Sequence, residues 1–126
     1  MGKLITSAQQ VRDANDTQYR IVSVPEWGDA DSELRIRSMS ANEISRFTNL
    51  KGDNQKSAMA RALVMCAVDE TGEPIFTMSD VPWMMDKSVS VLHRVQEAIL
   101  MLNGMKKDPD AEDEDPDDEV TRAGKD

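Results

Sequence analysis

The sequence predicts an α+β fold that is mainly α-helical: an N-terminal helix, one antiparallel β-hairpin, a bundle of about four helices and a disordered acidic C-terminal tail. Two observations carry this prediction. Residues 19–24 and 34–37 have the composition of strands, and the chain between residues 40 and 104 repeats apolar side chains at helical spacing. A chain of 126 residues holds one core and one domain. We expect a compact helical body with the hairpin at residues 1–105 and a disordered acidic tail or linker at residues 106–126.

The N-terminal helix is predicted at residues 7–15. Thr6 followed by Gln9 has the form of a capping box, in which the two side chains satisfy free backbone N–H groups at the helix start. The apolar residues that follow at helical spacing are Ala8, Val11 and Ala14. This apolar face is thin, so the helix needs a packing partner.

Two short runs with strand composition predict the hairpin. Residues 19–24 (YRIVSV) are β-branched and aromatic, and Leu34 and Ile36 alternate with two arginines in residues 34–37. Residues 25–31 between the runs are rich in turn formers. An antiparallel pair is therefore expected, with the second strand exposed on one face.

Two helices are predicted directly after the hairpin. Ser40 with Glu43 forms a second capping box, which opens a helix that reaches about Asn49. Residues 54–68 are dominated by Ala, Met and Leu and are typical of a central buried helix. The residues predicted for its buried face are Ala58, Met59, Ala62, Leu63, Cys66 and Ala67.

A turn cluster at residues 69–74 separates this helix from the last part of the body. After the apolar pair Ile75-Phe76, Ser79 is expected to cap a short helix with Pro82 in its first turn. The last helix has the strongest periodicity in the chain, and Asn103-Gly104 ends it with residues that tolerate the left-handed conformation. Its predicted buried residues are Val91, Leu92, Val95, Ala98, Ile99 and Leu102.

The charge of the chain is unevenly distributed. The net charge is -9, and residues 106–126 hold ten acidic against four basic residues, so the body is close to neutral. A near-neutral body has no positive field to collect phosphates, which argues against a nucleic-acid partner. No apolar run approaches the roughly 20 residues that a bilayer span needs, which argues against a membrane partner. A single cysteine fits a reducing compartment, so we expect the protein in the cytoplasm.

The residues that could carry chemistry favour structural roles. His93 is the only histidine and has Glu97 one helical turn later, so an exposed pair is expected rather than a metal or catalytic site. Cys66 has no histidine at a recognisable spacing and is expected in the core. Residues 29–40 begin like a calcium loop but have Leu34 where glycine is needed, so a solvated hairpin loop is expected. We predict no enzyme activity and no cofactor.

Methionine is abundant where aromatic residues are few. Flexible thioethers fill irregular cores, and they also suit surfaces that repack against several partners. A chain with thin apolar faces, a repacking surface and no reactive site is typical of a binding module. The residues predicted for partner binding or self-association are Trp27, Trp83, Met84, Met85, Met101 and Met105.

Three stretches of the chain together resemble the tail assembly chaperones of long-tailed bacteriophages. Residues 24–28 (VPEWG) and 34–40 (LRIRSMS) resemble that family's hairpin with its Pro-Glu-Trp-Gly turn and capped helix. Residues 68–76 (VDETGEPIF) resemble its acidic Gly/Pro turn, and residues 102–104 (LNG) the close of its last helix. The resemblance covers roughly residues 5–104.

The resemblance implies a small multimerising protein that binds the tape measure protein and tail tube subunits. Such a protein would act in the cytoplasm of the bacterial host and be absent from the mature virion. Genes of this family are often read in two frames, and codons for Ala123, Gly124 and Lys125 can contain a slippery heptamer. We expect a minus-one frameshift near Gly124-Lys125, with the acidic tail as a linker to an appended domain.

A second hypothesis belongs to another class of protein. An acidic decoy that imitates DNA would occupy a nucleic-acid-binding partner. It requires acidic side chains ordered on a rigid surface, whereas here they cluster at residues 108–119 with Pro109 and Pro116 among them.

Overall fold

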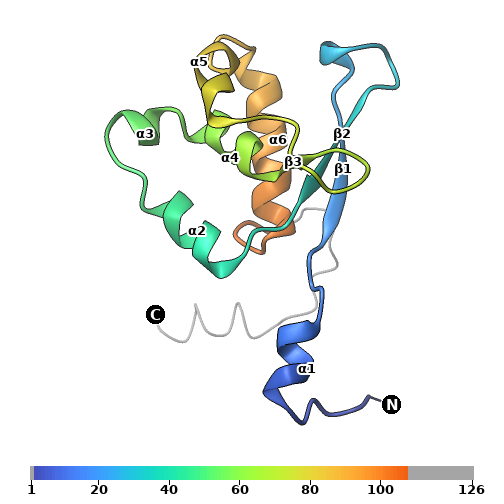
Figure 1. Ribbon diagram of the computed structural model, residues 1–126. Coiled ribbons are helices and arrows are strands. Elements are labelled where there is room, and N and C mark those ends of the chain that lie inside the picture. Colours follow the sequence, from blue (N-terminus) through green and yellow to red (C-terminus); the bar gives the residue numbers. More distant parts are fainter. Residues whose placement is uncertain (1, 108–126) are drawn as a thin grey trace, which may run out of the picture.

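A computed structural model of the protein describes residues 2–107 (Figure 1). The elements, in chain order, are α1 (Ala8–Asp13), β1 (Tyr19–Ser23), the 3₁₀ helix η1 (Pro25–Trp27), β2 (Glu33–Arg37), α2 (Ala41–Thr48), α3 (Asp53–Lys56), α4 (Ala58–Cys66), β3 (Ala67–Val68), the 3₁₀ helix η2 (Met78–Asp80), α5 (Val81–Met84) and α6 (Val89–Leu102). The predicted fold class, mainly helical with a β-hairpin, is confirmed. The predicted acidic tail falls almost entirely outside the described residues.

The hairpin forms where it was predicted. β1 pairs antiparallel with β2, and Ile21 lies opposite Arg35. Val22 in β1 and both Leu34 and Ile36 in β2 are buried, so one face of the pair belongs to the core. This alternation places every second side chain on the outer face, as the period of a strand requires.

A third strand was not predicted. The chain from residue 54 to 68 was expected to be one helix, but α3 and α4 are separate at Ser57 and α4 ends at Cys66. Ala67 and Val68 then form β3, which pairs antiparallel with β2. The pairing with a strand distant in the sequence outweighs the weak helical preference of these two residues.

The core lies between the sheet and the helices packed on it, chiefly α4 and α6. In Figure 1, α2 to α6 lie to one side of the hairpin, with α6 running behind α4. The predicted buried faces of α4 and α6 are largely confirmed, because both contribute several fully buried side chains. These are Ala60, Ala62, Leu63 and Cys66 from α4, and Val91, Leu92, Val95 and Ile99 from α6. Ala98 and Leu102 are partly buried against them.

The ends of the helices are held largely as predicted. Ser40 accepts a hydrogen bond from the N–H of Glu43, whose carboxylate accepts one from the N–H of Ser40, which confirms the capping box of α2. After α6, Gly104 has φ +71°, the left-handed conformation expected of it. The cap expected at Ser79 is wrong, because Thr77 and Asp80 form the capping box instead.

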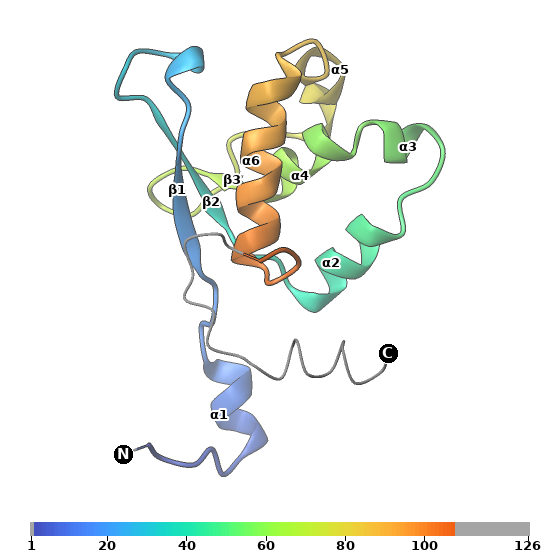
Figure 2. The same ribbon diagram turned by 180° about the vertical axis from the view of Figure 1, so that it is seen from behind.

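The N-terminal helix stands apart from the body (Figures 1 and 2). It is shorter than predicted, and its cap is Ser7 rather than Thr6. All residues from 2 to 16 have exposed side chains, so the packed body begins near β1. Among the described residues, no helix is long and apolar enough to cross a membrane.

Candidate functional site

A hollow of about 490 Å³ lies between the hairpin tip and α5. We call it the tip groove. Its walls combine two tryptophans, a phenylalanine and two aliphatic side chains with one acidic and one basic residue at the rim. The lining residues are Glu26, Trp27, Gly28, Phe76, Trp83, Met84, Lys87 and Leu92. Concave apolar sites with a few polar groups at the edge are the usual form of binding sites.

The hairpin wall of the tip groove is tied to α6 by an ion pair. Arg94 donates two hydrogen bonds to the carboxylate of Glu26, at 2.8 and 2.6 Å, and a third to the carbonyl oxygen of Ser23 at 3.1 Å. The hydrogen bonds from Arg94 lower the pKa of Glu26 to about 2. This pair therefore stays charged at any physiological pH and holds the tip beside the last helix.

Tight turn geometry sets the position of Trp27 within this wall. Pro25 starts η1, where the missing N–H of proline is not needed and its φ suits the helix. Gly28 follows, and a Cβ there would collide with the Oγ of Ser32, which accepts a hydrogen bond from the N–H of Asp29. The sequence Pro-Glu-Trp-Gly thus turns the chain sharply and leaves Trp27 partly buried against the core.

The opposite wall is built around Trp83. Its indole N–H donates to Asp80 at 2.9 Å, and its ring meets Phe76 edge to face with centroids 6.1 Å apart. The ammonium group of Lys87 lies 6.0 Å from the ring centroid. These contacts orient the ring although 46% of the residue remains exposed. A large aromatic ring that is exposed and fixed in orientation is typical of the side chains that anchor protein interfaces.

One of the residues predicted for partner binding or self-association is buried. Met84 is only 2% exposed, and it forms the floor of the tip groove from within the core. In the short helix α5, Trp83 lies at the surface, whereas the next residue, Met84, points into the core. Trp27 and Trp83 are brought together in the tip groove, although they are far apart in the sequence.

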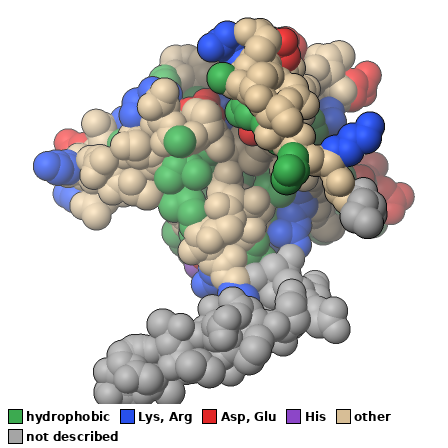
Figure 3. All heavy atoms as spheres, turned by 90° about the horizontal axis from the view of Figure 1, so that it is seen from below, with side chains coloured by type: hydrophobic (Ala, Val, Ile, Leu, Met, Phe, Trp, Pro, Cys, Tyr) green, Lys and Arg blue, Asp and Glu red, His purple; other side chains and the backbone are tan. Residues whose placement is uncertain are grey.

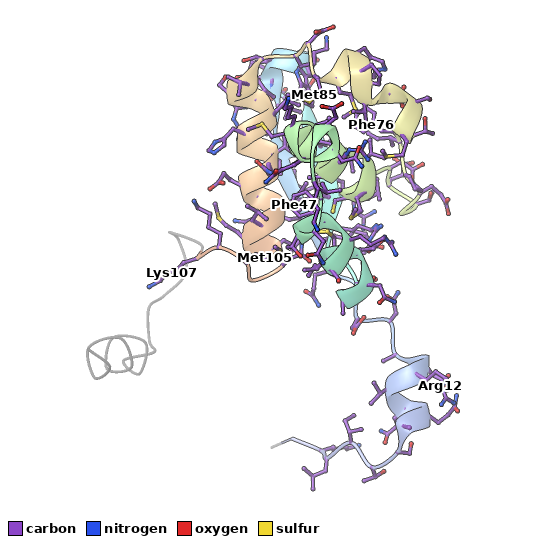
Figure 4. The ribbon with its side chains drawn as sticks, turned by 90° about the vertical axis from the view of Figure 1, so that its left-hand side faces the viewer. Arg12, Phe47, Phe76, Met85, Met105 and Lys107 are labelled. Atoms are coloured by element: carbon purple, nitrogen blue, oxygen red, sulfur yellow. The ribbon has the colours of Figure 1, made fainter. Side chains whose placement is uncertain are left out.

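The other predicted methionines do not join this site. Met85 and Met105 are 39% and 37% exposed, but Figure 4 shows them at opposite ends of the body. Met101 is half-buried on α6. On the face seen from below, exposed hydrophobic side chains form separate patches rather than one continuous surface (Figure 3).

A second hollow was missed in the sequence. It encloses about 370 Å³, and arginines form part of its rim. Its lining residues are Arg46, Phe47, Leu50, Arg61, Val64, Met65 and Met78. The side chains of Phe47 and Leu50 in this hollow are half-buried.

The residues considered for chemistry take the structural positions expected of them. His93 is exposed, and its Nε2 lies 3.6 Å from the carboxylate of Glu97. Cys66 is fully buried, and burial raises the pKa of its thiol to about 12. Within residues 2–107 no three His, Cys, Asp or Glu side chains are placed to hold a metal ion. Ala123, Gly124 and Lys125, assigned to the frameshift, lie outside the described residues.

Comparison with known proteins gives a likeness in fold. No family model and no curated protein matches the sequence. Among solved structures, the tail assembly chaperone of bacteriophage HK97 is similar, with a TM-score of 0.54 and 15% sequence identity. The match covers 81% of this chain and 95% of that one. The resemblance predicted from the sequence is therefore confirmed at the level of the fold, and the chain has the fold of a phage tail assembly chaperone.

Proposed function

We propose that this protein is a tail assembly chaperone of a long-tailed bacteriophage and that it acts by reversible binding rather than by catalysis. The observation that carries the proposal is the shared fold with the HK97 chaperone, which extends over most of both chains. The tip groove adds a physical means of binding. Trp83 is half-exposed and held by its contacts with Asp80 and Phe76, and Trp27 lies on the opposite wall, partly buried against the core.

The proposed partners are the tape measure protein, the tail tube subunits and further copies of this chain. A tape measure protein is long and helical, and its apolar stripe would aggregate if left in water. In the tip groove, an apolar side chain of such a helix would lie between Trp27 and Trp83, with Met84 beneath it. This is helix-in-groove recognition, in which apolar residues one turn apart serve as anchors.

Reversibility follows from the size and polarity of the site. A hollow of about 490 Å³ takes a few side chains, not a whole helix face. Each contact is weak enough to be replaced when tube subunits assemble around the tape measure protein. The protein would act in the host cytoplasm and leave before the virion matures. A minus-one frameshift near Gly124-Lys125 would supply a minority of longer chains.

The experiment is co-expression with the tape measure protein of the same phage. We expect the wild-type chaperone to keep that protein soluble and to copurify with it. Trp83→Ala should lose most of this activity, because it removes the exposed wall of the tip groove. Val89→Ala is the matched control, since Val89 is 66% exposed and lies outside the tip groove. A wild-type chain that neither binds nor solubilises the tape measure protein would overturn the proposal.

The nucleotide sequence of the gene tests the frameshift separately. Codons at positions 123–125 should contain a slippery heptamer, and the minus-one frame should stay open beyond it. A gene without that heptamer, or with an immediate stop in the minus-one frame, would remove the frameshift from the proposal.

A further inference from the structure

The second hollow combines an apolar interior with a basic rim. We call it the arginine hollow, and it lies between α2, α4 and η2. Five apolar side chains form its interior, and each keeps part of its surface exposed. They are Phe47, Leu50, Val64, Met65 and Met78. Arg46 and Arg61 complete the lining. Such a hollow suits a segment that carries an apolar side chain beside carboxylates.

Neither arginine of this hollow is paired with a carboxylate within residues 2–107. Arg61 donates hydrogen bonds to two uncharged acceptors, the hydroxyl of Ser57 at 2.8 Å and the side-chain carbonyl of Asn54 at 2.7 Å. Arg46 is exposed, and across the same residues its guanidinium makes no hydrogen bond or ion pair. Two positive charges therefore stay available to a ligand at the rim.

The segment that builds this hollow is basic, although the body as a whole is acidic. Residues 41–66, which contain α2, α3 and α4, hold four basic and two acidic residues. Residues 1–40 and 67–105 together hold seven basic and twelve acidic residues. One of the two acids near the hollow, Glu43, already accepts two hydrogen bonds from Arg37, at 2.9 and 2.8 Å. The positive charge of the body is thus concentrated around the arginine hollow.

The chain leaves the body near the same helices. The side-chain oxygen of Asn103, just after α6, accepts a hydrogen bond from the N–H of Met39 at 2.7 Å, and Met39 lies two residues before α2. Figures 1 and 2 show the end of α6 and the start of α2 at the same end of the body. α2 has eight residues and is about 12 Å long. The residues after Lys107 therefore start about one short helix away from the arginine hollow.

The residues after Lys107 have the chemistry that this hollow suits. Nine of the twelve residues 108–119 are acidic. Val120 follows directly after Asp117, Asp118 and Glu119, and it is the one branched aliphatic residue in the sequence from 108 to 126. Residues 117–120 thus combine three carboxylates with one apolar side chain, which complements two arginines around an apolar interior.

We propose that residues 117–120 of this chain fold back onto the arginine hollow of the same molecule. The side chain of Val120 lies against the apolar interior, and the carboxylates before it lie beside Arg46 and Arg61. The inference goes beyond the proposed function, because it concerns a hollow separate from the tip groove. The acidic tail then covers an apolar surface of its own body, and a partner segment of the same chemistry would have to displace it.

The length of the chain permits this contact. From Lys107 to Val120, a flexible chain would span about 20 Å on average and at most about 43 Å. The distance from the end of α6 to the far end of α2 is on the order of 15–20 Å. A linker whose average length matches the span gives the highest effective concentration, so exposed ion pairs that are weak between separate molecules can hold the segment. The tip groove is less suitable, because it lies beside the start of α6 and has Glu26 at its rim.

The test is a nitroxide spin label on the full chain, attached through Ala123→Cys. Cys66 is fully buried, so the reagent labels the new thiol. In NMR spectra we expect the amide signals of Phe47, Leu50 and Met65 to lose most of their intensity, whereas those of the tip groove keep it. Full intensity at the arginine hollow would overturn the proposal. Spin-labelled chains are also mixed with isotope-labelled chains that carry no spin label. Loss of signal in that mixture would show that the tail of another copy fills the hollow, which would overturn the contact within one molecule.

Substitutions in the spin-labelled chain test the two parts of the contact. Arg46→Glu replaces an attraction by a repulsion and should lower the ratio of docked to undocked tail about fivefold. Arg12→Glu is the matched control, because Arg12 is exposed and lies far from the body in Figure 4. Val120→Ser should also restore the signals, whereas Ala111→Ser should not. Val120→Ser changes no residue of the packed body, so it tests the contact even if Arg46→Glu lowers stability. Equal signal loss within either pair of variants would overturn the proposal.

Discussion

Trp83 and Met84 are adjacent in the chain, but their replacement by alanine should have different effects. Trp83 is 46% exposed at the wall of the tip groove, and Met84 is 2% exposed at its floor. Replacing each by alanine therefore separates binding from folding at one site. Trp83→Ala should weaken partner binding and leave the body folded, whereas Met84→Ala should chiefly destabilise the body.

The magnitudes follow from what each side chain contacts. Truncating a fully buried methionine leaves a cavity and costs about 2–5 kcal/mol. Trp83→Ala loses the hydrogen bond to Asp80 and the edge contact with Phe76, each worth about 1 kcal/mol at a half-exposed site. For binding the order reverses, since removing a tryptophan anchor costs about 2 kcal/mol or more, or about 30-fold in Kd.

Urea unfolding followed by circular dichroism measures the first effect, and titration with the tape measure protein measures the second. Each kcal/mol lowers the Tm of a domain this size by about 4–8 °C, so Met84→Ala should melt at least about 8 °C lower. A Trp83→Ala variant that unfolds more readily than Met84→Ala would refute this assignment of wall and floor. Equal binding by Trp83→Ala and wild type would remove Trp83 from the site.

Three further predictions concern the body. The hydrogen bonds from Arg37 lower the pKa of Glu43 from 4.5 to about 2, so stability present above about pH 4.5 should be lost as the pH falls through about 2. The free energy of unfolding should fall by on the order of 3 kcal/mol over this range. In the Glu43→Gln variant, acid unfolding should show little of this loss. The same pH dependence in the variant and the wild type would contradict the pairing of Arg37 with Glu43. Cys66 should resist alkylation at pH 8 until urea unfolds the chain, because its thiol is buried and its pKa is raised. Mass spectrometry measures the labelling. Rapid labelling of the folded protein would mean that Cys66 is not buried. Asn103→Ala should cost about 1–3 kcal/mol in urea unfolding, because it removes the acceptor for the N–H of buried Met39 at 2.7 Å; a loss within error would show that water replaces it.

The sequence was most informative where a pattern is local. The hairpin, the capping box at Ser40 and the last helix each depend on residues within a few positions of one another, and all three are confirmed. The third strand is different. Ala67 and Val68 extend the apolar pattern of α4, and only the edge offered by β2, about thirty residues earlier, turns them into a strand.

The candidate site shows the same division. Residue type pointed to Trp27 and Trp83, but their meeting in one groove depends on the tertiary arrangement that places η1, α5 and α6 around the same hollow. Arg94 and Glu26 are charged residues on exposed segments, and nothing in their local sequence marks them as partners 68 positions apart. The burial of Met84 could not be predicted, because a four-residue helix is too short for periodicity to separate its inner side from its outer side.

The link between the two walls of the tip groove is suited to reversible binding. One wall belongs to the hairpin tip and the other to α5. An ion pair between Arg94 and Glu26 connects the tip to the helices, and these side chains are 40% and 44% exposed. Exposed ion pairs contribute little to stability and weaken with salt, so this pair constrains the tip only weakly. Since the pKa of Glu26 lies at about 2, protonation does not release the pair in a cell. Opening must then come from a partner whose apolar side chain enters between Trp27 and Trp83.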